Sequence, residues 1–208
     1  MARTVGARNS DYLERRNALI NKVRDRLSLQ DGEAPSYREL ALAAGVSVPT
    51  LRHYFGSREQ LIKAIFAHSL AGAAPHLARA RTTEVDDLQA SLTGFLRRVV
   101  IGWTSGNVGA LHRIGLAEGL RSPGTALDYL TDVLEPTLQA LETRLGAYRA
   151  QGRIVPCNLR HAALLLLSPM VLALLHQHDL GGTRCRPLSI PDLITEHVKV
   201  FVRAYRAS

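Results

Sequence analysis

Apolar residues in this chain recur every three or four positions, and no stretch of four or more residues alternates cleanly between apolar and polar side chains. This spacing is the period of an amphipathic α-helix. The first apolar stripe, from Leu13 to Leu27, predicts a helix over residues 10–29 that ends at the turn QDG. The same period predicts five long helices after residue 80, separated by Gly- and Pro-containing breaks, at 85–105, 108–120, 124–151, 159–178 and 190–206. The fold class is therefore predicted to be all-α.

Capping signals divide residues 36–60 into short elements. The runs SYRE at 36–39 and SREQ at 57–60 fit the capping box, in which the Ser hydroxyl and the side chain three residues later each accept from the other's backbone N–H. Ser47 is a third cap, and Pro49 suits the first turn that would follow it. Gly45 supplies the permissive backbone of a sharp exit. These signals predict helices at 36–44 and 47–55 and a longer one from Ser57. A similar box, SIPD, begins the helix predicted at 190.

Two short helices joined by a Gly-containing turn form the helix-turn-helix pattern, whose second helix exposes one face to DNA. On a helical wheel, Leu51 and Phe55 share the face that would pack on the core. Pro49 and His53 point almost directly away from it. Thr50 and Arg52 lie on the two flanks, and Tyr54 lies near the edge of the core face.

The outward side chains suit DNA chemically. Arg can donate two hydrogen bonds to guanine, Thr can contact a base edge, and His and Tyr can donate to phosphates or bases. Arg38 and Arg58 lie near helix starts, where backbone N–H groups also favour phosphate. The alternative is that Arg52 and His53 are simply exposed to solvent and contact no DNA.

The run SYRELALAAGVSVPTLRHYFGSREQLIKAIF, residues 36–66, resembles the N-terminal DNA-binding domain of the TetR family of transcriptional regulators. The resemblance implies a helix-turn-helix domain at 1–58 and a ligand-binding and dimerisation domain at 59–208. Within the first domain, residues 1–9, with Arg3 and Arg8, are expected to form a mobile basic arm. It places DNA contacts at Tyr37, Arg38, Thr50, Arg52, His53, Tyr54 and Arg58. Two features depart from the family pattern: Arg52 stands where the family usually has Tyr, and the first helix lacks an aromatic residue before its terminal Gly.

The last two predicted helices indicate a second copy as partner. One carries an apolar stripe from Ile194 to Tyr205, and the run HAALLLLSPMVLALLHQH at 161–178 is apolar nearly all round. A helix of that kind lies at the centre of its domain or packs against another subunit, and two such helices per chain would build a four-helix homodimer interface. The residues predicted for it are Leu165, Leu172, Ile194, Val198, Phe201 and Tyr205.

An effector site is expected among the middle helices, with an aliphatic lining that implies an apolar or amphipathic small molecule. Each candidate also fits plain core packing. Trp103, His112 and Tyr129 stand out because each joins apolar area to a polar tip. The predicted set is Phe95, Val99, Trp103, His112, Leu116, Tyr129, Val133, Met170 and Leu174.

Composition narrows the remaining classes. The 208 residues carry a net charge of +8, which suits a polyanionic partner without locating its site. Neither Cys157 nor Cys185 has metal-ligand spacing, and His176 and His178 face different ways on a helix, so no metal or other cofactor is expected. No signal-peptide core is present, and the apolar stretch 162–175 is short and contains a proline, so we expect a cytoplasmic protein outside the membrane.

These observations favour a homodimeric repressor that a small effector releases from palindromic double-stranded operator DNA. A TetR-type activator has the same sequence features. A helical ligand-binding module without sequence-specific DNA binding also stays open. No arrangement of nucleophile and base, and no phosphate-binding Gly loop, supports an enzyme, and no catalytic residue is predicted.

Overall fold

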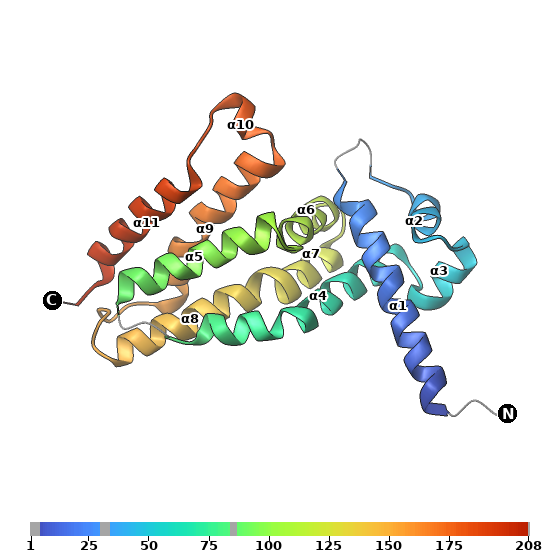
Figure 1. Cartoon of the computed structure of the whole chain (residues 1–208), viewed down its shortest axis with the longest axis horizontal. Helices are drawn as coiled ribbons and strands as arrows, with labels where there is room; N and C mark the ends of the chain where they lie inside the picture. The colour runs from blue at the N-terminus through green and yellow to red at the C-terminus, as the bar shows by residue number, and fades with distance from the viewer. Residues whose placement is uncertain (1–4, 30–33, 84–86, 208) are drawn as a thin grey trace. The chain divides into compact units, whose positions relative to one another are not determined.

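The computed structural model describes residues 5–29, 34–83 and 87–207 (Figure 1). Within these ranges no β-strand occurs, and one isolated antiparallel bridge joins Ile154 to Arg206. The helices are α1 (Val5–Ser28), α2 (Tyr37–Ala44), α3 (Val48–Phe55), α4 (Arg58–Arg81), α5 (Leu88–Thr104), α6 (Val108–Gly119), α7 (Pro123–Tyr129), α8 (Glu135–Ala150), α9 (Leu159–Leu174), α10 (Gly182–Cys185) and α11 (Ile190–Tyr205). The predicted all-α fold is confirmed.

The predicted caps begin the observed helices. At the start of α4, the Gln60 N–H donates to Ser57 Oγ at 3.2 Å and the Ser57 N–H donates to Gln60 Oε1 at 2.9 Å. At the start of α11, Ser189 Oγ accepts from the Asp192 N–H at 3.4 Å. The start of α5 differs from the prediction, because Asp87 caps it and the predicted start at 85 lies outside the described residues.

Two predicted helices contain a change of helix type. Leu130–Leu134, between α7 and α8, and Leu175–Asp179, after α9, are π-helical. A π-turn adds a residue without ending the helix, so apolar periodicity does not reveal it. Pro169 lies inside α9 instead of interrupting it, and α10 forms within the predicted loop at 181–187.

The chain divides into two compact units. Unit 1 comprises Met1–Gly72 and Ala110–Val133, and unit 2 comprises Ala73–Gly109 and Leu134–Ser208. These units differ from the two functional domains predicted from the sequence, which meet at residue 58. The boundary at residue 58 stays a prediction.

Unit 1 is built on one apolar core. Buried side chains of α1 to α4, among them Ile20, Leu40, Leu51 and Ile65, pack together with Ile114 of α6. The same core continues to Tyr129, which ends α7. The short helices α2 and α3 are therefore fixed by burial of one face, since helices of this length are marginal alone.

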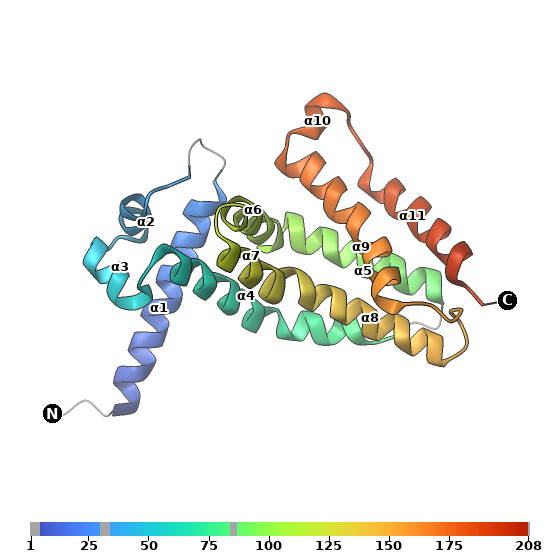
Figure 2. The ribbon, with the colours of Figure 1, turned by 180° about the vertical axis from the view of Figure 1, so that it is seen from behind.

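Unit 2 is a helical bundle in which α9 packs against α5, α8 and α11 (Figures 1 and 2). Unit 2 contains a fully buried arginine, Arg144 of α8. Its guanidinium donates to the carbonyls of Arg79 and Ala80 at 3.1 and 2.7 Å and to Ser91 Oγ at 2.6 Å. Because Arg79 and Ala80 lie in the last turn of α4, this side chain caps that helix from within the bundle.

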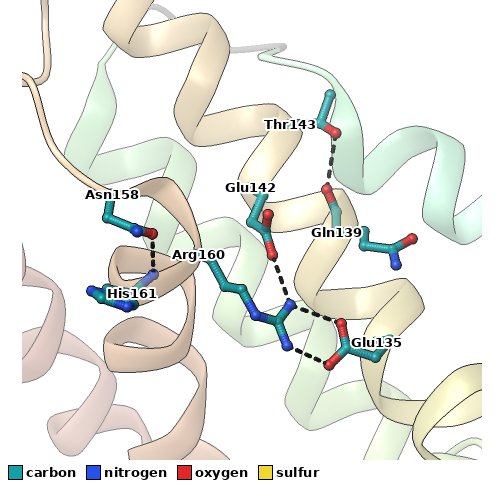
Figure 3. Close-up of polar contacts among 7 residues, drawn as sticks. All are labelled: Glu135, Gln139, Glu142, Thr143, Asn158, Arg160 and His161. Atoms are coloured by element: carbon teal, nitrogen blue, oxygen red, sulfur yellow. Dashed lines mark hydrogen bonds and ion pairs between the residues drawn. The ribbon is translucent and has the colours of Figure 1, made fainter.

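The outer contact between α8 and α9 is ionic (Figure 3). Arg160 donates to both carboxylate oxygens of Glu135, at 2.7 and 2.9 Å, and to Glu142 at 3.4 Å. The Arg160 hydrogen bond holds the pKa of Glu135 below its usual value, and Glu135 raises the pKa of Arg160. The bidentate geometry sets the position of α9 along α8. It adds little stability, because the Arg160 side chain is half exposed.

The helical stretch Leu159–Asp179 is the one described segment that is long and apolar enough to cross a membrane. At 21 residues it exceeds the stretch 162–175 on which the sequence prediction rested. Such a stretch is also typical of a core helix, and here Leu166, Leu167 and Met170 contribute to the core of unit 2.

Candidate nucleic-acid interface

The turn between α2 and α3 is fixed by local hydrogen bonds. Ser36 and Glu39 form both bonds of the predicted capping box, at 3.3 and 2.7 Å. Gly45 ends α2 in the left-handed region at φ 73°, and its N–H donates to the carbonyl of Leu42 at 2.9 Å. A residue with a side chain would be strained at this φ, so glycine determines where the chain turns.

Helix α3 buries the face that the wheel predicted. Leu51 is fully buried and Phe55 is 6% exposed, whereas Arg52 and His53 on the other side are exposed. Thr50 is half-buried, and its hydroxyl lies 2.8 Å from the hydroxyl of the capping residue Ser47. The exposed edge of α3 thus presents Arg52 and His53 outright, while Thr50 already has a partner.

Arg52 lies over an aromatic ring at the start of α2. Its guanidinium carbon is 5.9 Å from the ring centroid of Tyr37, and the Tyr37 hydroxyl donates to the carbonyl of Gly56 at 3.0 Å. Burial raises the pKa of Tyr37, and the charge of Arg52 partly opposes that shift. Tyr37 and Arg52, both predicted to contact DNA, are thus brought together, and the Tyr37 ring supports the Arg52 guanidinium by a cation–π contact.

Arg38 and Arg58 are placed differently from each other. Arg38 is exposed in the first turn of α2. Arg58 is half-buried, and its guanidinium donates to Glu118 of α6 at 2.6 and 3.0 Å and to the carbonyl of Pro35. A phosphate contact by Arg58 stays a prediction, since this side chain already spans from α4 to α6 within unit 1.

The sequence did not predict the contacts that α1 makes with α3. Tyr12 stacks on Tyr54 with ring centroids 5.0 Å apart, and the Arg16 guanidinium lies 5.0 Å from the ring centroid of Phe55. The spacing of four between Tyr12 and Arg16 places both on one face of α1 and is the only sequence signal for them.

Two family models match this chain. One is described as bacterial regulatory proteins of the tetR family and matches residues 28–65. The other is described as the C-terminal domain of AefR-like transcriptional repressors and matches residues 90–207, more than half of the chain. The chain belongs to the TetR family of transcriptional regulators. The resemblance and the predicted architecture, an N-terminal helix-turn-helix domain followed by a C-terminal helical domain, are confirmed.

Several solved structures share this fold, among them proteins described as TetR-family regulators. One from Mesorhizobium loti covers 94% of this chain and 98% of its own, with 16% identity and a TM-score of 0.74. GusR of Salmonella enterica covers 92% and 96%, with 24% identity and a TM-score of 0.68. The flavonoid-responsive regulator FrrA covers 93% and 97%, with 23% identity and a TM-score of 0.64. A comparison with curated protein sequences gave no match.

TetR regulators are typically dimers that bind effectors, and the residues predicted for the effector are divided between the two units. Those in unit 2 are buried or half-buried: Phe95, Val99, Trp103, Met170 and Leu174. Those in unit 1 are His112, Leu116, Tyr129 and Val133, of which Leu116 is 37% exposed. All three polar tips have internal partners: Trp103 Nε1 donates to Asp179 at 3.0 Å, and His112 Nδ1 lies 2.7 Å from the Tyr129 hydroxyl.

The residues predicted for the dimer interface also fall into two groups. Leu165 and Leu172 are 57% and 67% exposed on α9. The stripe on α11 packs into the core of its own unit, where Ile194, Val198 and Phe201 are at most 4% exposed.

Two histidines of unit 2 lie close in sequence in the π-helical segment that follows α9. His176 Nδ1 lies 2.7 Å from the amide of Gln177, and His178 is exposed. Among the residues that the structure describes, no group of three or more His, Cys, Asp or Glu is arranged to hold a metal ion.

Acid should destabilise unit 1 through His112. Burial lowers the pKa of His112 from 6.5 to about 4, so the folded state keeps the imidazole neutral where the unfolded chain protonates it. The contribution of His112 to stability is therefore constant above about pH 6.5 and falls as pH drops toward 4, by about 3 kcal/mol in total at ~1.4 kcal/mol for each pKa unit. Urea unfolding of the unaltered chain and of His112→Gln at several pH values checks this. Equal pH slopes for the two proteins would show that His112 is not the group responsible.

Proposed function

We propose that this protein is a homodimeric repressor that binds a palindromic operator and leaves it when a small apolar or amphipathic molecule binds the C-terminal domain. The observation that carries the proposal is the exposed pair Arg52 and His53 on a helix whose opposite face is fixed in the core at Leu51 and Phe55. A rigid helix with donors on one side meets the requirement for entering the major groove. Such a regulator acts in the cytoplasm, without a membrane or an enzymatic step.

The operator contacts are proposed to divide by role. Arg52 and His53 donate to base edges, and Arg52 most favours guanine because its guanidinium can donate two parallel hydrogen bonds. Arg38 and the hydroxyl of Tyr54 contact the phosphates that flank the groove. Tyr37 exchanges its bond with the carbonyl of Gly56 for a phosphate contact. Thr50 exchanges its bond with Ser47 for a base contact, and the role of Arg58 depends on whether it can leave Glu118.

The dimer is proposed to form through α9 and α11. The exposed leucines Leu165 and Leu172 lie seven residues apart on α9, so they share a face that a second copy would cover. Ile194, Val198 and Phe201 would support that surface from inside the subunit, and the half-buried Tyr205 would lie at its edge. A dimer suits a palindromic operator, whose two half-sites are read by two recognition helices about one DNA turn, roughly 34–36 Å, apart.

The effector class is proposed from the residues predicted to line its site. Phe95, Val99, Met170 and Leu174 offer apolar area, and Trp103 adds an indole N–H. FrrA, which has the same fold, is flavonoid-responsive, and a similarly folded protein from Bacillus halodurans is a fatty acid degradation regulator. Both names concern apolar or amphipathic chemistry, which supports an effector of that class here.

Selection of bound duplexes from a random pool tests the DNA half of the proposal. The unaltered chain should enrich an inverted repeat, and the double variant Arg52→Ala, His53→Ala should bind it at least tenfold more weakly, since each lost base contact is worth about 1–3 kcal/mol. Arg97→Ala, which removes an exposed arginine from α5, controls for net charge. Enrichment of no inverted repeat, or equal enrichment by the double variant, would refute the role of α3.

Adding candidate effectors to the selected complex tests the regulatory half. Release of the duplex by a flavonoid or a fatty acid is the expected result for a repressor. Tighter binding in their presence would instead indicate an activator. A chain that binds such a molecule and no duplex at any salt concentration would be a ligand-binding module.

A further inference from the structure

The recognition helix is supported from outside the helix-turn-helix by the first half of α1. Tyr12 stacks on Tyr54 with an interplanar angle of 21°, and Arg16, one turn later, covers the ring of Phe55. The two contacted rings are the last two residues of α3. Figure 1 shows α1 running beside α3 within unit 1 and extending past it.

The ring contacts continue from Tyr54 to the exposed surface of α3. The imidazole of His53 meets the Tyr54 ring edge-on, with centroids 5.6 Å apart and an interplanar angle of 79°. Tyr54 is half-buried, whereas Tyr12 is 38% exposed and His53 is exposed. Tyr54 therefore lies between a ring that belongs to α1 and a ring that faces the proposed DNA surface.

This arrangement matters because the core holds Leu51 and Phe55 of α3 but leaves Tyr54 half-buried. The helix has eight residues, and Gly56 ends it in a conformation at φ 72° and ψ −117° that favours glycine. Side chains in a last turn keep rotamer freedom, and binding must then remove it. A stacked ring removes part of that freedom before DNA arrives.

We propose that Tyr12 is a positioning residue for the recognition helix: its ring fixes the ring of Tyr54, and through it the imidazole of His53, in the orientation that the operator requires. Tyr12 acts through Tyr54 and makes no base contact of its own. The inference rests on the proposed function and adds a residue of α1 that lies outside the helix-turn-helix.

The first test uses the protein without DNA. NMR relaxation of ring-labelled tyrosines should show that Tyr54 becomes more mobile in Tyr12→Ala and stays ordered in Tyr12→Phe, which keeps the stacked ring. Leu13→Ala, which truncates an exposed neighbour on α1, should leave Tyr54 unchanged. Unchanged order of Tyr54 in Tyr12→Ala would overturn the proposal.

The second test measures affinity for the duplex that the unaltered chain enriches most. Tyr12→Ala should weaken binding about fivefold to tenfold, as loss of an aromatic pair predicts, while Tyr12→Phe changes it less than twofold. In a Tyr54→Ala background, Tyr12→Ala should have no further effect. Additive losses, or a loss in Tyr12→Phe equal to that in Tyr12→Ala, would show that Tyr12 acts by another route and would overturn the proposal. If no duplex is enriched, the proposed function fails, and the ring measurement still decides whether Tyr12 orders Tyr54.

Discussion

Replacing Gly115 by alanine is expected to destabilise unit 1 by about 3 kcal/mol, the upper range for overpacking a core. Gly115 is buried on α6 against the ring of Tyr129, and a methyl group there would overlap the ring, lying 2.6 Å from Cε2. The ring is also fixed on its far side, because its hydroxyl lies 2.7 Å from Nδ1 of His112. To make room, the ring must leave its place, which breaks that hydrogen bond and the contact with Phe66.

Urea unfolding followed by circular dichroism measures this effect as a lower midpoint at an unchanged slope. Gly72→Ala is the matched control, because Gly72 is helical and a methyl group there meets nothing within 4 Å. That change should stabilise the chain by roughly 0.5–1 kcal/mol through helix propensity. A Gly115→Ala midpoint at or above that of the unaltered chain would mean that Tyr129 does not pack on α6 in this way.

The features that the sequence predicted best are those whose causes are local. Ser36, Gly45 and Ser47 act on backbone groups within four residues of themselves, so the two short helices and their turn followed from spacing alone. The outward direction of Arg52 and His53 followed from the geometry of one helix once Leu51 was taken as buried.

Side-chain pairs between distant segments could not be predicted. Nothing in the sequence indicates that Arg58 pairs with Glu118, sixty residues away, or that Arg144 caps α4 from α8. An arginine at a helix start suits a phosphate and a carboxylate equally well, and only the fold decides which is near.

The stripe on α11 shows a related limit. Its apolar period correctly indicates that one face is buried, but the period does not say against what. Val198 is fully buried within its own unit, whereas Leu172, on a helix that is apolar nearly all round, is two-thirds exposed. The candidates for a partner surface are therefore found by exposure in the fold and not by periodicity.

Removing the carboxylate of Glu118 is expected to cost about 3 kcal/mol of stability, because it leaves the half-buried Arg58 without its charged partner. The Glu118 side chain is 9% exposed and accepts two hydrogen bonds from Arg58, which also donates to the carbonyl of Pro35. The hydrogen bonds of Arg58 therefore join α4 both to α6 and to the segment before α2. Urea unfolding of Glu118→Ala measures the loss.

An exposed ion pair in the same unit provides the comparison. Lys63 and Asp128 join α4 to α7 at 2.9 Å, but the lysine is largely exposed, so Asp128→Ala should cost much less than Glu118→Ala. Equal losses in the two variants would mean that burial does not distinguish the pairs and that Arg58 is not held as the structure indicates.

Variants of the Arg58–Glu118 pair test whether Arg58 contacts DNA. Arg58→Met and Glu118→Ala both break the bridge, but only Arg58→Met removes a positive charge from the proposed interface. If Arg58 reaches a phosphate, the dependence of log affinity on log salt should become shallower by about one unit per subunit in Arg58→Met alone, because one counterion fewer is released. If Arg58 serves only to hold α4, both variants should keep the slope of the unaltered chain and lose affinity only as unit 1 loses stability. Affinity is measured at a temperature well below the thermal unfolding midpoint of each variant. A less stable fold then lowers only the fraction of protein that can bind, and the salt slope is unchanged.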